Sequence, residues 1–169
     1  FVGRPAAARA TTAGGCIRVP VQEAPVPLGV LRGLEGCRLD LVTGASLLVW
    51  PEDRAAWGRL TALLTRGKGR ADPQRGEKGK CFLHWEDVAE NAQGLVASLV
   101  PGRDGSTPDE LQWMADLFGR DRGHVCLTFY RRPGDVQRLL RDEQAAQWYG
   151  LTPLATGDVL YHEPARRRL

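Results

Sequence analysis

The sequence contains few of the residues from which metal clusters and disulfide frameworks are built. It has three His and four Cys among 169 residues. The cysteines, Cys16, Cys37, Cys81 and Cys126, are far apart and form no C-x-x-C pair, which argues against a zinc cluster or a disulfide framework. We therefore expect free thiols and a cytoplasmic location for the chain.

Long apolar runs and a strong net charge are also missing. No apolar stretch approaches the ~20 residues of a membrane-spanning helix, and the first residues are too rich in Arg, Gly and Pro for a signal peptide. The 23 basic and 20 acidic residues leave a formal charge of +3, so only local clusters could attract a phosphate. We expect no membrane partner. A hydrophobic content of 43% is enough for the core of one ordinary domain.

The first part of the chain differs from the rest. Residues 1–29 contain four prolines and no sustained helical period, so we expect residues 1–35 to form an irregular N-terminal segment. The runs CRLDL and SLLVW then predict a β-hairpin that turns at Thr43 and Gly44. A helix is expected to begin near Pro51, to bury Trp57, Leu60 and Leu64 on one face, and to end at Gly67.

The second half repeats a helix followed by a short apolar strand. Three strands, LVASLV, HVCLTF and TPLAT, each follow a predicted helix. Thr107 and Glu110 have the spacing of a capping box, and Leu111, Met114 and Phe118 mark the buried face of the helix that they begin. This alternation predicts an α/β fold with mostly parallel strands and buried sheet faces. In such folds functional residues lie at the carboxyl ends of the strands.

The segment PLATGDVLYHEP, residues 153–164, lies at such a carboxyl end and carries Asp158 and His162. These two side chains are the candidate metal ligands of the sequence. A single Asp can also accept backbone N–H bonds in the turn after a strand. His84 and His124 have no second ligand three or four residues away, so we expect each to be structural or solvated.

Three stretches together resemble the polymerase and histidinol phosphatase (PHP) domain of bacterial error-prone DNA polymerases, the C-family enzymes of translesion synthesis. They are GCRLDLVTGASLLVWPEDRAAWGRLTALLTRGK, HWEDVAENAQGL and LTPLATGDVLYHEPARRRL. The resemblance covers residues 36–169 and implies the later part of a distorted β/α barrel at the amino end of a much larger polymerase. Because the chain begins without Met and ends in ARRRL, we expect it to be a section of a longer protein.

The resemblance also supplies the ligand positions of metal-active relatives. Where they have Gly-x-Glu, this chain has Arg38, and where they have Asp-x-His, Leu160 follows Asp158 and the histidine comes two places later, at His162. A shift of two residues along an extended segment moves a side chain by roughly 6 to 7 Å. We therefore interpret Asp158 and His162 as remnants of a metal site, and expect no catalytic residue and no cofactor in this chain.

The segment RGKGRADPQRGEKGK, residues 66–80, concentrates six basic residues with four glycines. It predicts a mobile basic loop in which Arg66, Lys68, Arg70 and Lys78 could contact nucleic-acid phosphates. It matches no phosphate-binding glycine motif and contains no aromatic residue that could stack on a base.

The resulting interpretation is a non-catalytic PHP scaffold within an error-prone DNA polymerase, inactive by itself. Its partners would be the remainder of the polymerase chain and, through it, DNA. The resemblance implies Mg²⁺ in a palm domain outside this sequence. Two alternatives stay open: a free-standing metal-dependent PHP phosphoesterase, and a small nucleic-acid-binding module.

Overall fold

A computed structural model describes residues 36–157, apart from the side chain of residue 73. The chain first forms β1 (Cys37–Asp40), β2 (Ser46–Pro51) and α1 (Arg54–Gly69), and after a short 3-10 turn (Pro73–Arg75) it forms α2 (Trp85–Asn91). It continues through β3 (Leu95–Val100), α3 (Pro108–Arg122), β4 (Gly123–Thr128), α4 (Asp135–Trp148) and β5 (Thr152–Thr156).

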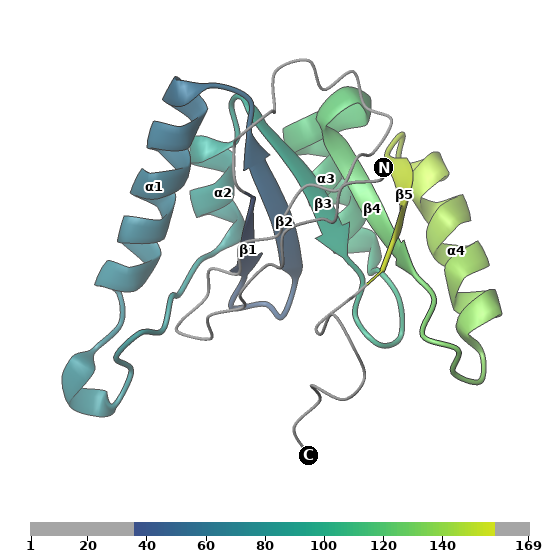
Figure 1. Ribbon diagram of the computed structural model, residues 1–169, viewed down its shortest axis with the longest axis horizontal. Coiled ribbons are helices and arrows are strands. Elements are labelled where there is room, and N and C mark those ends of the chain that lie inside the picture. Colours follow the sequence, from purple (N-terminus) through teal and green to yellow (C-terminus); the bar gives the residue numbers. More distant parts are fainter. Residues whose placement is uncertain (1–35, 158–169) are drawn as a thin grey trace, which may run out of the picture.

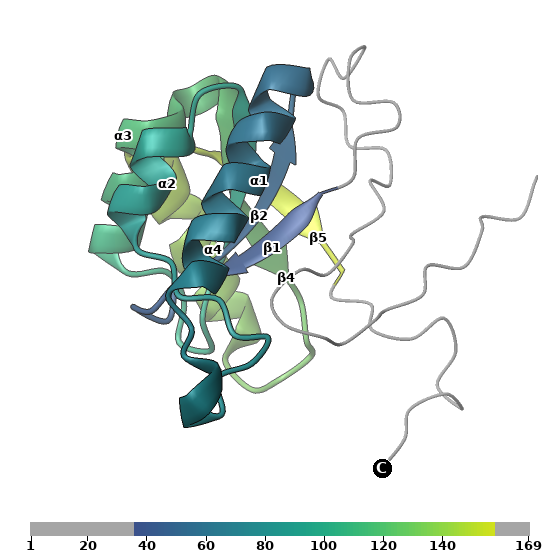
Figure 2. The same ribbon diagram turned by 90° about the vertical axis from the view of Figure 1, so that its left-hand side faces the viewer.

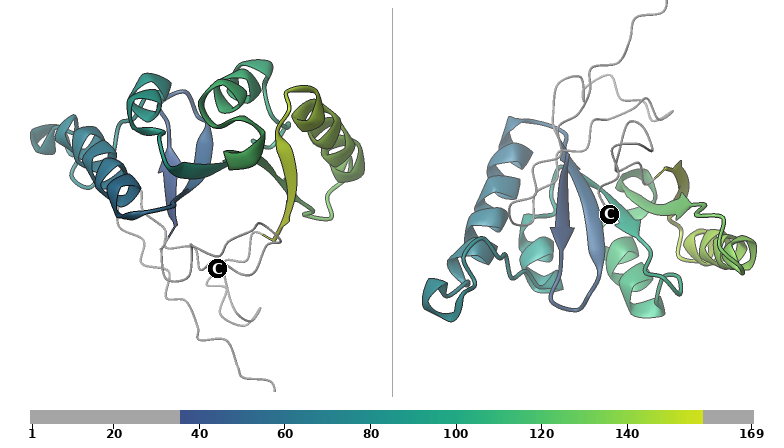
Figure 3. Two further views of the ribbon diagram at one scale, coloured as in Figure 1. Left: turned by 90° about the horizontal axis from the view of Figure 1, so that it is seen from above. Right: turned by 60° about the horizontal axis from the view of Figure 1, so that its bottom comes forward.

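The strands form one sheet in the order β1-β2-β3-β4-β5. The β3–β4 and β4–β5 pairs are parallel, whereas β1–β2 and β2–β3 are antiparallel. All four helices lie on one face of the sheet (Figures 1 and 2), and viewed from above they follow its curve (Figure 3). The predicted α/β class is confirmed. The prediction of mostly parallel strands holds only for the second half of the sheet, because β3 runs antiparallel to β2 of the predicted hairpin. A closed PHP-type barrel stays a prediction.

The hairpin and α3 form where the sequence predicts them. The β1–β2 turn contains Gly44 at a φ of 93°, a conformation that glycine adopts without steric cost. Thr107 is the N-cap of α3 and forms a reciprocal capping box with Glu110. The buried side chains of α3 are Leu111, Met114 and Phe118, as its apolar period indicates.

Helix α1 departs from its prediction at both ends. Pro51 is the last residue of β2, and Asp53 instead caps the helix by accepting a bond from the Ala56 N–H at 2.6 Å. Gly67 does not end α1 but lies inside it, where a Cβ would come within 2.5 Å of the Cys81 sulfur. Its role is therefore to let α1 approach the chain at Cys81. The predicted burial of Trp57 is also wrong, because its side chain is 42% exposed.

The core lies between the sheet and the helices. Alternate strand residues point into it, including Leu39, Leu47, Leu99 and Val125, each at most 1% exposed. Because successive strand side chains point to opposite faces, the residues between them form the second face of the sheet. In the described part of the chain, no helix is long and apolar enough to cross a membrane.

The described sheet has two unpaired strand edges, which favour association of the isolated chain. Within residues 36–157, β1 and β5 each pair with one strand only, and unpaired strand edges promote association. Several large apolar side chains are also exposed, with Trp148 at 87% and Phe129 at 55%. We expect the isolated chain to be poorly stable or to self-associate. Size-exclusion chromatography and a thermal melt check this, and a monodisperse monomer with one sharp transition would contradict it.

Candidate functional site

The sheet face that points away from the helices carries Arg38, the position at which the resemblance places an acidic ligand. Strand pairing places on this face residues from all five strands: Arg38, Asp40, Ser46, Leu48, Trp50, Val96, Ser98, Val100, His124, Cys126, Thr128, Thr152, Leu154 and Thr156. Directly paired residues share a face. The charged groups among these residues are Arg38 and Asp40, so this face supplies a single carboxylate.

That carboxylate is engaged by its neighbours. The Arg38 side chain donates from Nε to Asp40 at 2.9 Å and from a terminal nitrogen to the Ser46 hydroxyl at 3.1 Å. Ser46 in turn bonds to Asp40 at 2.5 Å. A guanidinium therefore stands where the resemblance places an acidic ligand, and it neutralises the nearest carboxylate. This arrangement disfavours a cation at β1.

The middle of the same face carries small polar groups. Ser98 and Cys126 are hydrogen-bonded at 2.9 Å, and Thr128 and Thr156 at 2.6 Å. Burial raises the pKa of the Cys126 thiol and lowers that of His124. His124 is 6% exposed, and a hydrogen bond with the backbone of Thr152, its neighbour on β5, partly opposes the lowering of its pKa. His124 is therefore buried, which excludes the solvated role that the sequence left open for it.

The two candidate metal ligands, Asp158 and His162, lie outside the described residues. Within residues 36–157 no group of three His, Cys, Asp or Glu side chains could hold a metal ion. Two basic residues, Arg131 and Arg132, follow β4 in a loop where Arg131 has a φ of 58°.

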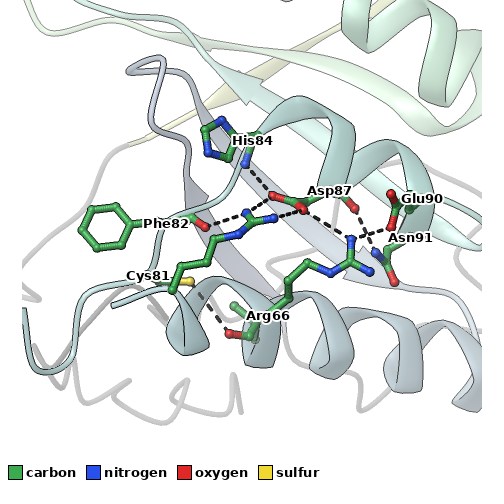
Figure 4. Close-up of polar contacts among 9 residues, drawn as sticks. Arg66, Cys81, Phe82, His84, Asp87, Glu90 and Asn91 are labelled. Atoms are coloured by element: carbon green, nitrogen blue, oxygen red, sulfur yellow. Dashed lines mark hydrogen bonds and ion pairs between the residues drawn. The ribbon is translucent and has the colours of Figure 1, made fainter. Parts of the chain in front are cut away.

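The predicted nucleic-acid contacts divide into two sets. Residues 66–69 are the last turn of α1 and not part of a loop, which corrects the predicted extent of that loop. Arg66 and Arg70 both pair with Asp87 of α2. Arg66 also pairs with Glu90, and Figure 4 shows it pointing toward both acidic residues. These two guanidiniums are each about two-fifths exposed (43% and 40%). Because acidic groups neutralise them, they are poorly placed to attract a phosphate.

Asp87 is the centre of this cluster and was not singled out from the sequence. Its carboxylate accepts bonds from both arginines. It also accepts a bond at 2.9 Å from the backbone N–H of His84, the residue that caps α2 (Figure 4). Hydrogen bonding, from Arg70 foremost, holds the pKa of Asp87 well below its usual range and outweighs the opposing effect of burial. The cluster ties the end of α1 to the start of α2.

Lys68 and Lys78 belong to the second set. With Lys80 they line a groove of about 600 Å³ whose other walls include Leu39, Leu64 and Phe82. We call it the basic groove, and within residues 36–157 none of its three lysines forms an ion pair. The sequence shows no aromatic residue inside the basic segment, but Phe82 follows it by two positions and the fold brings it to the lysines.

These features define a mixed α/β domain with a polar sheet face and a basic groove at one end. No family model matches the chain. Error-prone DNA polymerase 2 of Agrobacterium fabrum is 42% identical over 153 residues, or 83% of this chain and 14% of the relative. Error-prone DNA polymerase 3 of the same organism is 46% identical over 140 residues, or 82% of this chain and 12% of the relative.

A third relative extends the similarity to another organism. The error-prone DNA polymerase of Caulobacter vibrioides is 46% identical over 143 residues, or 82% of this chain and 13% of the relative. The chain is thus homologous over about four-fifths of its length to proteins named error-prone DNA polymerase. It spans 12–14% of the length of these relatives.

Proposed function

We propose that the chain is part of an error-prone DNA-directed DNA polymerase and that this part is a non-catalytic PHP-type scaffold. The similarity to three such polymerases supports the parent activity. The observation that carries the scaffold role is Arg38, whose guanidinium is bonded to Asp40 and Ser46 where a metal-active domain needs an acidic ligand. A metal cluster needs several convergent anionic or imidazole groups.

In this proposal the parent protein is a nucleotidyltransferase of DNA repair and damage-induced mutagenesis. It adds nucleotides across damaged template positions, with Mg²⁺ held by carboxylates of a palm domain outside this chain. The described domain contributes a folded unit against which the rest of the polymerase packs. Exposed apolar side chains such as Phe129 and Trp148 fit such a packing role.

The coding sequence that flanks this chain in its genome tests whether the chain belongs to a DNA polymerase. We expect an in-frame palm domain with its metal-binding carboxylates downstream. A closed reading frame on both sides, with no polymerase sequence nearby, would contradict the proposal and favour a free-standing domain.

We further propose that the basic groove touches DNA in the parent. Lys68, Lys78 and Lys80 line this groove together with Phe82, which offers an aromatic ring. Lysines bind phosphates as point charges, so this contact would be weak and indifferent to base sequence.

Salt dependence provides the measurement. Replacing Lys68 and Lys78 by Gln should reduce the slope of log affinity against log salt for single-stranded DNA by about 1.4, because each lost phosphate contact releases ~0.7 fewer counterions. The double variant Arg54→Gln/Arg120→Gln is the charge-matched control, since both residues are exposed and lie at the opposite end of the strands, where β2 ends and β4 begins. An equal slope in the lysine variant and the unchanged chain would leave the groove without a role in binding.

A further inference from the structure

A second groove lies where β3 and β4 end, at the same end of the strands as the basic groove. It has a volume of about 620 Å³ and is lined by residues of the two loops and of the first turns of α4: Gly102, Arg103, Asp104, Tyr130, Arg132, Pro133, Gly134, Asp135, Arg138 and Arg141. The loops that leave β3 and β4 lie at this end in Figure 1. Pockets for small molecules commonly have this volume, and carboxyl strand ends commonly bind ligands in α/β proteins.

Buried ion pairs hold the walls of this groove, which we call the arginine groove. The Arg138 side chain is 9% exposed, pairs with Asp135 and Asp142, and donates to the Thr128 carbonyl at 2.7 Å. Asp142 also accepts a bond from the Ser106 N–H at 2.8 Å. Both loops are therefore fastened to α4, and the groove is preformed.

The loop after β4 is fastened a second time. Asp135 accepts bonds from the backbone N–H groups of Tyr130 at 2.7 Å and Arg132 at 3.2 Å. The Arg132 guanidinium lies over the Tyr130 ring, 4.8 Å from its centre. This contact orients one cation at the wall of the groove.

The charge that remains in the groove is positive. Arg138 is neutralised by Asp135 and Asp142, whereas the guanidiniums of Arg103, Arg132 and Arg141 form no ion pair with residues 36–157. Besides Asp135, the described lining residues include one carboxylate, that of Asp104. The amino end of α4, where Gly134 provides no side-chain cap, adds partial positive charge to the same wall.

We propose that the arginine groove binds the phosphate of a nucleotide. Guanidinium groups bind phosphate oxygens through paired hydrogen bonds, and three of them suit a group with several anionic oxygens. The volume leaves room for a sugar and base, and the Tyr130 ring lies at the wall. The nucleotide is either a free deoxynucleoside phosphate or a residue of a DNA strand. This site is separate from the basic groove and does not depend on the lysines.

Calorimetric titration of the 169-residue chain with deoxyadenosine 5′-monophosphate, inorganic phosphate and a short oligothymidylate tests the proposal. We expect saturable binding of at least one nucleotide probe, weakened about tenfold or more in Arg103→Gln/Arg141→Gln, a loss of about 1.4 kcal/mol. Tighter binding of the monophosphate identifies a free nucleotide as the ligand, and tighter binding of the oligonucleotide identifies a strand.

Two variants separate this site from other causes. Arg54→Gln/Arg120→Gln removes the same charge at the opposite end of the strands and should leave the affinity for nucleotide unchanged. Lys68→Gln/Lys78→Gln should leave monophosphate binding unchanged even if it weakens oligonucleotide binding at the basic groove. Circular dichroism confirms that each variant is folded. Absence of saturable nucleotide binding, or equal affinity in Arg103→Gln/Arg141→Gln and the unchanged chain, would overturn the proposal.

Discussion

Replacing Arg138 by Met will lower the free energy of unfolding by about 3 to 5 kcal/mol. The substitution keeps the apolar stem but removes the guanidinium between Asp135 and Asp142, whose side chains are 6% and 4% exposed. Two buried carboxylates then lose their common cation, and the Thr128 carbonyl loses a donor. Chemical denaturation monitored by circular dichroism measures the change.

The control for this variant lies on the same helix. Arg141 is exposed and belongs to no ion pair within residues 36–157, so Arg141→Met should change stability by less than about 0.5 kcal/mol. Similar losses in the two variants would show that the Arg138 network does not stabilise the fold.

Replacing Asp87 by Asn will lower the free energy of unfolding near neutral pH by about 2 to 3 kcal/mol. The charged carboxylate bonds two guanidiniums and the His84 N–H, and an amide can accept only part of this set. The loss is smaller than for Arg138 because Arg66 and Arg70 are partly exposed and water can solvate them. Chemical denaturation of Asp87→Asn and of Glu90→Gln compares the loss of a buried acidic partner of Arg66 with the loss of an exposed one. Glu90→Gln should lower the free energy of unfolding by less than about 1 kcal/mol.

The contribution of Asp87 to the stability of the fold also depends on pH. Its pKa is lower in the folded chain than in the unfolded chain, where Asp titrates near 3.9. The stabilisation is therefore fully present above about pH 5 and is lost as the pH falls through the unfolded and then the folded pKa. In Asp87→Asn, stability should fall less steeply below about pH 5. If the free energy of unfolding of Asp87→Asn fell as steeply below about pH 5 as that of the unchanged chain, the stabilising role of this carboxylate would be contradicted.

Local signals in the sequence predict the elements whose cause is local. The capping box of Thr107 and Glu110 specifies the start of α3, and the glycine at position 44 specifies the hairpin turn. The end of α1 could not be predicted in this way. From the sequence, Gly67 predicts the end of the helix. In the structure it lies inside α1, where the absence of a side chain lets the helix pack against Cys81 and Leu83.

In the candidate sites too, the sequence predicts features with a local cause but not those that depend on distant residues. The sequence identifies the basic segment and the substitution of Arg38 for an acidic ligand, because both are visible as residue types at known positions. It does not distinguish Arg70 from Lys78, since the partner of Arg70 is Asp87, seventeen residues away. The arginine groove was missed for the same reason: Arg103 and Arg141 come from separate elements that meet only in the folded chain.

The central claim, that this domain is a scaffold without a metal centre of its own, is tested most directly by its metal content. The chain would be refolded with Zn²⁺ or Mn²⁺, freed of unbound metal and measured by elemental analysis, alone and as Asp158→Ala, with phosphoester hydrolysis followed in parallel. We expect no stoichiometric metal cluster, no hydrolysis and no difference between the two chains. Two or more metals per chain, lost on Asp158→Ala, would contradict the claim.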